Sequence, residues 1–295
     1  MNTGDDARVV DGRPLIRDTW PLGWGDLLRL VGLTVALIAV TTGIGLLLIE
    51  TFEDSALLRA DDRIARWFED QRTSTLDTAT LIGSWLSETL TKVVVTAIIA
   101  VLLLRRTRRW LEPLAIALPL IVEAIAFICT TTIVGRDRPA VVQLDESPVS
   151  SSFPSGHVAA AVAYGAIAVV LIAEYRSRAV RIATISATIA IPIIVALARM
   201  YRGMHHLTDV VAGALLGVAS VVGTLALVQR AETLGFLLLS RPGGHQAAAA
   251  AAPAVPTMRQ GISSGPFRAS VQRSVKVVGA VRLPDTTAAV SRLST

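Results

Sequence analysis

Long apolar runs separated by short polar stretches dominate the chain between about residues 27 and 230. Most of these runs are long enough to cross a hydrocarbon core about 30 Å thick as a single helix. We expect six spans, with approximate bounds 27–49, 90–104, 111–134, 156–173, 182–197 and 209–228. The pattern therefore predicts an all-α fold, a six-span transmembrane helical bundle with a disordered C-terminal tail.

The segments that flank the apolar runs are polar. Residues 1–26 mix both charges and contain Pro14 and Pro21, and we interpret them as a cytoplasmic N-terminal lead. After residue 230 the chain becomes rich in Ala, Gly, Ser, Pro and Arg, a composition typical of disorder. We therefore divide the chain into the lead, a six-helix membrane domain (27–230) and a disordered basic cytoplasmic tail (231–295).

A polar stretch of about residues 50–88 follows the first span. Within it, Ile64, Trp67 and Phe68 are spaced so that they share one face of an amphipathic helix. Glu88 and Lys92 are four residues apart, so we expect them to pair on one helix face.

Composition supports a membrane protein and excludes several other classes. Hydrophobic residues make up 52% of the chain and charged residues only 17%, with a mean hydropathy of +0.57. The net charge is +5, but the basic residues cluster beside apolar runs and in the tail, so we expect no nucleic-acid partner. The single cysteine, Cys129, excludes an intrachain disulfide. A composition rich in Ala, Val and Arg but poor in Lys indicates a bacterial source.

Clusters of arginine predict the orientation of the bundle. Arg105, Arg106, Arg108 and Arg109 follow the second span, and a second cluster at 176–181 follows the fourth. Positive charge in short loops stays cytoplasmic. Both termini are therefore expected in the cytoplasm, and the loops after spans one, three and five on the outer face of the bacterial inner membrane.

Two of these outer loops contain the residues that suit a phosphate group. Arg138 and Arg199 offer guanidinium groups, whose geometry matches phosphate oxygens. Ser155 and Gly156 precede the fourth span, where a helix N-terminus presents unpaired N–H groups to an anion. We therefore expect a phosphate site on the outer face.

The same loops contain candidate acid–base groups. His205 and Asp209 are four residues apart, so the carboxylate can orient the imidazole and stabilise its cation. His157 comes from the other loop and can protonate a leaving oxygen. His206 is expected to point about 100° away around the helix and to have no role.

The order and spacing of these residues resemble the type-2 phosphatidic acid phosphatase family. Its three-part pattern is Lys, six residues, Arg-Pro; then Pro-Ser-Gly-His; then Ser-Arg, five residues, His, three residues, Asp. The first part is present as Arg138-Pro139, the second is complete at 154–157, and the third is present as Arg199, His205 and Asp209. The resemblance covers about residues 80–230, with the motifs between 131 and 209.

The resemblance implies a role for each matching residue. His205 attacks phosphorus to form a phosphohistidine, Asp209 orients it, and His157 protonates the leaving group. The remaining residues would hold the phosphate: Arg138, Arg199, Ser155 and Gly156. The resemblance also implies that no metal or other cofactor is needed, and that the substrate is a lipid phosphate or polyprenyl pyrophosphate met among membrane lipids.

Two positions depart from the family pattern, because Thr131 replaces the lysine and Ala198 the serine. Thr131 is expected to line the phosphate site by position, with Arg136 supplying the missing charge. Three alternatives stay open: a phosphotransferase using the same phosphohistidine, a weakened or non-catalytic member, and a transporter. The oligomeric state and the identity of the lipid are open too.

Overall fold

The protein, described here by a computed structural model, is defined over residues 22–52, 55–147, 149–175 and 177–239. These residues form helices and loops, with no strand among them. The helices are α1 (Trp24–Thr51), α2 (Ala56–Asp70), α3 (Ser74–Trp85), α4 (Thr89–Thr107), α5 (Leu111–Val134), α6 (Gly156–Ala163), α7 (Gly165–Glu174), α8 (Arg178–Tyr201) and α9 (Leu207–Leu239). Most of the predicted lead and the predicted tail beyond residue 239 lie outside the described residues.

The predicted all-α membrane bundle is confirmed. Among the described residues, five helical segments are long and apolar enough to span a membrane: α1, α5, α6 with α7, α8, and α9. The pair α3 and α4 makes a sixth span if both helices are counted together across their 47° bend. The second predicted span is therefore not one straight helix but two helices with a break between Trp85 and Thr89.

Some predicted boundaries differ from those of the structure. Helix α9 continues to Leu239, past the boundary set at residue 230, because its apolar run continues through 233–239. The fourth span divides into α6 and α7 at Tyr164. Helix α8 extends to Tyr201, so Arg199 lies in its last turn rather than in a loop.

Large apolar side chains cover the outside of the bundle. Leu28 on α1, Leu90 on α4 and Ile189 on α8 are 71%, 73% and 59% exposed. Water would penalise so much exposed apolar surface, whereas lipid chains are as apolar as these side chains. The exposed faces therefore suit an integral membrane protein.

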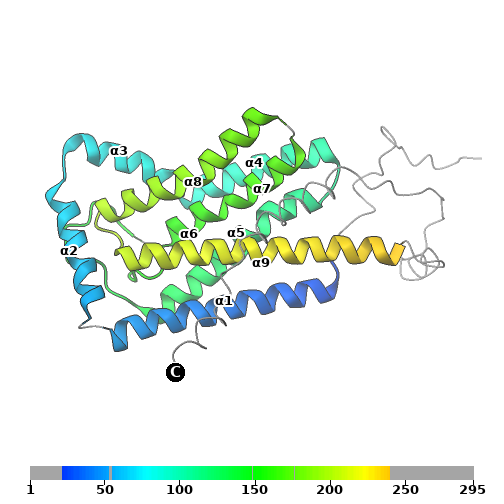
Figure 1. Ribbon diagram of the computed structural model, residues 1–295. Helices are drawn as coiled ribbons and strands as arrows, with labels where there is room; N and C mark the ends of the chain where they lie inside the picture. The colour runs from blue at the N-terminus through cyan, green and yellow to red at the C-terminus, as the bar shows by residue number, and fades with distance from the viewer. Residues whose placement is uncertain (1–21, 53–54, 148, 176, 240–295) are drawn as a thin grey trace, which may run out of the picture.

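The helices meet around α5 and α9, and α9 runs the length of the bundle beside α1 (Figure 1). Helix α2 lies across the end at which α1 ends and α9 begins (Figure 1). Its residues Ile64 and Phe68 pack against the cluster around Val158 and Val210, whereas Trp67 is 57% exposed. The predicted amphipathic segment is therefore a helix that covers one end of the bundle.

We call this covered end the site end, defined by the ends of α5 and α8 and the beginnings of α6 and α9. Closely packed small residues hold α6 against α9 there. A Cβ atom on Gly213 would overlap the carbonyl of Ser155, and one on Gly217 would overlap the carbonyl of Ala159. Glycine at both positions therefore allows the two backbones to approach closely, as in small-residue helix interfaces of membrane proteins.

Candidate active site

The structure brings the two predicted outer loops together at the site end. The backbone N–H of Ser155 donates to the carbonyl of Asp209 over 3.0 Å, which ties the start of α6 to the start of α9. The N–H of Leu144 donates to the carbonyl of Arg202 over 3.0 Å, which ties the long loop to the end of α8. His157, Arg199 and His205 consequently lie close enough to act on one another electrostatically.

His205 lies between α8 and α9 and is 5% exposed. Its Nδ1 is 2.7 Å from the carbonyl oxygen of Ser152. A carbonyl oxygen only accepts, so Nδ1 carries the proton and Nε2 keeps its lone pair. Burial, followed by the positive charge of Arg199, holds the pKa of His205 well below its ordinary value. The imidazole is therefore neutral at physiological pH, which is the form that acts as a nucleophile.

Asp209 does not make the predicted hydrogen bond to His205. Its Oδ2 is 4.0 Å from Nδ1 of His205, which is too long for a hydrogen bond. The same oxygen accepts from the backbone N–H of His206 over 2.8 Å and lies 3.2 Å from its Nδ1. His206 therefore contacts the carboxylate of Asp209, and the expectation that it has no role in the chemistry stays a prediction. The Ser152 carbonyl fixes the tautomer of His205, and Asp209 acts on it through its charge.

Arg136 does not take the place predicted for it at the phosphate. It is 7% exposed, and its guanidinium bonds to Asp209, to the hydroxyl of Thr208 over 2.7 Å and to Asp61 over 3.0 Å. Two buried carboxylates require a cation between them. Arg136 is therefore committed to the ion pairs that fix the start of α9, and it does not replace the missing lysine.

Arg199 is the predicted phosphate ligand whose geometry is clearest. Its Nη1 donates to the hydroxyl of Ser84 and to Asp145, both over 2.8 Å. Burial alone would raise the pKa of Asp145, but the hydrogen bond from Arg202 and the charge of Arg199 bring it below its ordinary value. Asp145 is therefore an anion that holds both arginines, because Arg202 also donates to it over 2.6 and 2.7 Å.

Three buried polar groups at the motif positions have no hydrogen-bond partner among the described residues. They are Nε of Arg199, Oγ of Ser155 and Oγ1 of Thr131. An unpaired buried donor costs about 1–3 kcal/mol, more when charged, so native structures seldom retain one without a reason. Ser155 is completely buried and Thr131 is 3% exposed, so water does not compensate them on the surface. Such groups fit an absent polar ligand.

Arg138 lies beside this site, in the loop between α5 and α6. Its guanidinium donates to the carbonyl of Met204 over 2.6 Å, to Ser147 Oγ over 2.7 Å and to the carbonyl of Val149 over 3.0 Å. Burial lowers its pKa, and the charge of Asp209 partly offsets this effect. The predicted phosphate ligand is therefore bound to its own loop in this structure, and only its charge reaches His205.

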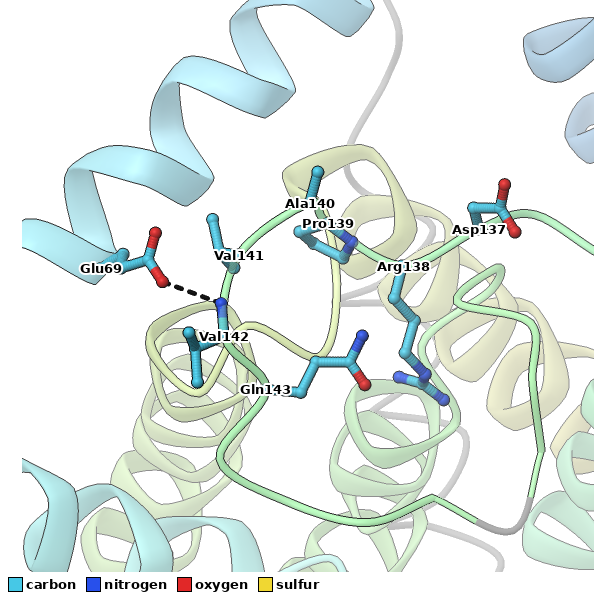
Figure 2. A pocket seen from close by; sticks show the side chains of 8 residues that line it. All are labelled: Glu69, Asp137, Arg138, Pro139, Ala140, Val141, Val142 and Gln143. Atoms are coloured by element: carbon cyan, nitrogen blue, oxygen red, sulfur yellow. Dashed lines mark hydrogen bonds between the residues drawn. The ribbon is translucent and has the colours of Figure 1, made fainter.

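An open pocket of about 740 Å³ lies beside Arg138 and is lined by the following loop residues, up to Gln143 (Figure 2). Glu69 on α2 accepts the backbone N–H of Val142 over 2.8 Å and fixes the far side of the pocket (Figure 2). The guanidinium of Arg138 and the amide of Gln143 lie near each other in this view. The loop therefore presents polar groups next to the buried site.

Sequence reasoning missed the groups that α3 and α4 contribute. The predicted pair of Glu88 and Lys92 is wrong, because Glu88 lies 3.2 Å from Nε2 of His157 and Lys92 lies 3.7 Å from Glu123. Helix α4 begins at Thr89, so Glu88 is its N-cap residue and lies outside the helical spacing. Only the polar composition of 84–88 between two apolar runs could have signalled the break. Asp61 and Asp145 are likewise known only from the fold.

No three His, Cys, Asp or Glu side chains are grouped to hold a metal ion in the part of the chain that the structure describes. That the activity requires no metal stays a prediction from the sequence.

Comparisons with known proteins agree with this architecture. A family model described as "PAP2 superfamily" matches residues 112–233. The chain is similar in fold to a crystal structure described as the first transmembrane PAP2 type phosphatidylglycerolphosphate phosphatase from Bacillus subtilis. The match has 24% identity and a TM-score of 0.58, and it covers 67% of this chain and 96% of that one. A crystal structure of Aquifex aeolicus LpxE matches with 22% identity and a TM-score of 0.41, over 57% of this chain and 93% of that chain. A search of curated proteins gives no match.

Proposed function

We propose that this chain, which belongs to the PAP2 superfamily over residues 112–233, is a membrane phosphatase that removes a phosphate group from a lipid. The observation that carries the proposal is the state of His205. Its imidazole is buried and neutral, and Nδ1 is held by a carbonyl, so that Nε2 keeps its lone pair. Positive charge from Arg199 and Arg138 surrounds it, which suits a group that must attack an anion.

The reaction would proceed in two displacements. The lone pair on Nε2 of His205 attacks phosphorus, the bond to the lipid oxygen breaks, and His157 gives a proton to that oxygen. Water then attacks the phosphohistidine, His157 takes a proton from the water, and the bond to Nε2 breaks. Inorganic phosphate leaves, and both imidazoles return to their first state.

The buried polar groups without a hydrogen-bond partner among the described residues are the proposed contacts of the phosphate. Nε of Arg199 and the hydroxyls of Ser155 and Thr131 are buried and available at one end of the bundle. The backbone N–H groups at the start of α6 add donors and a positive dipole end. A Cβ on Gly156 would lie 2.7 Å from the ring of Phe127, so glycine is needed where this helix begins.

We place the site on the extracytoplasmic face. The basic clusters at the end of α4 and the start of α8 lie at the opposite end of the spans from His205. Short basic loops remain cytoplasmic, so the site end would face outward. Phosphatidylglycerophosphate is one candidate substrate, since the Bacillus relative in fold is described as acting on it. Phosphatidate and polyprenyl pyrophosphate are the others.

A phosphate-release assay tests the proposal. The purified protein in detergent with a metal chelator would be given each of the three lipid classes. We expect release from at least one lipid, and a loss of about 10⁴-fold or more for His205→Ala, since a missing nucleophile removes the covalent route. His206→Ala removes the adjacent imidazole and should cost much less. Release by His205→Ala near the wild-type rate would disprove the mechanism, and release from no lipid would disprove the function.

A further inference from the structure

We propose that Glu88 is a positioning residue for His157, fixing the tautomer of the imidazole and favouring the cation that gives its proton to the leaving oxygen. The inference rests on the proposed function and adds a residue that no motif contains. It begins from one contact, the 3.2 Å between Oε2 of Glu88 and Nε2 of His157. The two residues are 69 positions apart, so the contact is a product of the fold.

The broken span explains how a carboxylate reaches this place. Helices α3 and α4 meet at 47°, and Glu88 is the last residue of the break. Here the break directs Ser84 to Arg199 and Glu88 to His157, so both polar side chains meet residues of the site.

The contact defines the chemistry of the imidazole. A carboxylate only accepts hydrogen bonds, so Nε2 of His157 carries a proton in this pair. Nδ1 is then the nitrogen left to exchange a proton with the substrate. In the cation, Nδ1–H gives its proton to the leaving oxygen, and the neutral ring retains Nε2–H toward Glu88. In the second displacement Nδ1 takes a proton from the attacking water, which restores the cation.

The other charged groups around His157 make the carboxylate necessary. Arg199 on α8 and Lys92 on α4 act on the ring as cations, and His205 faces it from the link before α9. The charge of Lys92 is partly offset by Glu123 on α5, 3.7 Å away. Burial of the ring opposes an imidazolium most, and these cations, which favour phosphate binding, oppose it further. Glu88 supplies the opposite charge, as a carboxylate does for the histidine of a catalytic triad.

Two substrates that differ in their leaving group separate this role from a structural one. A lipid phosphate expels an alkoxide, which must be protonated, whereas p-nitrophenyl phosphate expels a stable anion that needs little help. For Glu88→Gln we expect a loss of about 10²-fold in kcat on the lipid, the lower end of general acid catalysis. Release from p-nitrophenyl phosphate should fall by less than about threefold.

The pH profile gives a second readout. Activity that depends on a protonated His157 declines as the pH rises and the proton is lost. Without the carboxylate the cation is less stable, so Glu88→Gln should move this decline to lower pH by about one unit. Glu88→Asp, which retains the charge, should recover part of the lipid activity. Glu50→Gln removes an exposed carboxylate at the end of α1 and should change neither readout.

The outcomes separate the two proposals. If the wild type hydrolyses neither substrate, the proposed function fails. If it hydrolyses both, and Glu88→Gln lowers both equally with an unchanged pH profile, only the role of Glu88 fails. If Glu88→Gln does not fold, two other variants test the role of Glu88. They are Glu88→Asp alone and Glu88→Asp combined with His157→Ala. Added to His157→Ala, the Glu88→Asp change must cause no further loss if it acts through the imidazole.

Discussion

The two ends of the bundle are stabilised by different interactions. At the site end, Arg136 lies between Asp61 and Asp209, and Asp145 lies between Arg199 and Arg202. At the far end, where α4 ends and α5 begins, the core is mostly apolar, and the buried Glu112 accepts a hydrogen bond from Thr107 there. The buried apolar members of this core are Leu103, Leu111, Ala115, Ile116, Leu118, Ile167, Val170, Ala173 and Val228.

The difference follows from what each end must do. A site for a phosphate needs fixed positive charge, and buried cations need anions to hold them. Apolar packing at the far end has no such requirement and only needs to exclude voids. The buried arginine–aspartate pairs therefore lie at the end that contains the two imidazoles, where they fix geometry more than they add stability.

Removing the cation at the centre of the site end should have the largest effect. Arg136→Leu leaves Asp61 and Asp209 buried without compensation, which is expected to cost about 3–5 kcal/mol of stability. Thermal unfolding in detergent and the specific activity would measure it. At the far end, Ile116→Val should cost about 1 kcal/mol and leave activity per folded molecule unchanged. Equal effects of the two changes would show that the ends do not differ as described.

A smaller effect is expected where α6 meets α9. Gly213→Ala places a Cβ against the backbone of Ser155, which cannot move without shifting the start of α6. We expect a loss of about 1–3 kcal/mol, together with lower activity because Ser155 and His157 move away from His205. Gly43→Ala on α1 is the matched control, since its Cβ meets nothing within 4 Å. A fully active Gly213→Ala would contradict the close approach.

The smallest effect is expected when the activity is measured at lower pH. Because burial and Arg199 lower the pKa of His205, the imidazole stays neutral, and nucleophilic, as the pH falls through its ordinary range. Lowering the pH from 7 to about 5.5 should therefore leave kcat/KM nearly unchanged on the acid side. A nucleophilic histidine with an ordinary pKa near 6.5 would lose about tenfold by pH 5.5. A loss of that size in a pH–rate profile would contradict the electrostatics derived for the site.

The sequence was sufficient for the features that depend on local spacing. Apolar runs located most helix ends to within a few residues, except the end of α9 at Leu239, and α5 begins and ends where the pattern predicts. The positions of His205, Asp209 and Arg199 on either side of one short link follow from their spacing. Such features need only the helical repeat and the length of a span.

The remaining features depend on which helices become neighbours. Glu88 with His157 and Asp61 with Arg136 are separated by 69 and 75 residues. A four-residue spacing predicted Glu88 with Lys92, and it failed because the helix begins at Thr89. Arg136 was assigned to the phosphate because its charge suited the motif. Its two buried carboxylate partners become apparent only when α2 brings Asp61, and α9 brings Asp209, to the site end.

The proposed mechanism depends above all on the transfer of phosphate through a protein side chain. The stereochemical course at phosphorus tests this directly, with a lipid phosphate made chiral by oxygen isotopes and an alcohol as the acceptor, so that the product is a chiral phosphate ester. Two successive in-line displacements, first by His205 and then by an acceptor, predict retained configuration in the product. Inverted configuration would mean that the acceptor attacks phosphorus directly, and it would contradict a phosphohistidine.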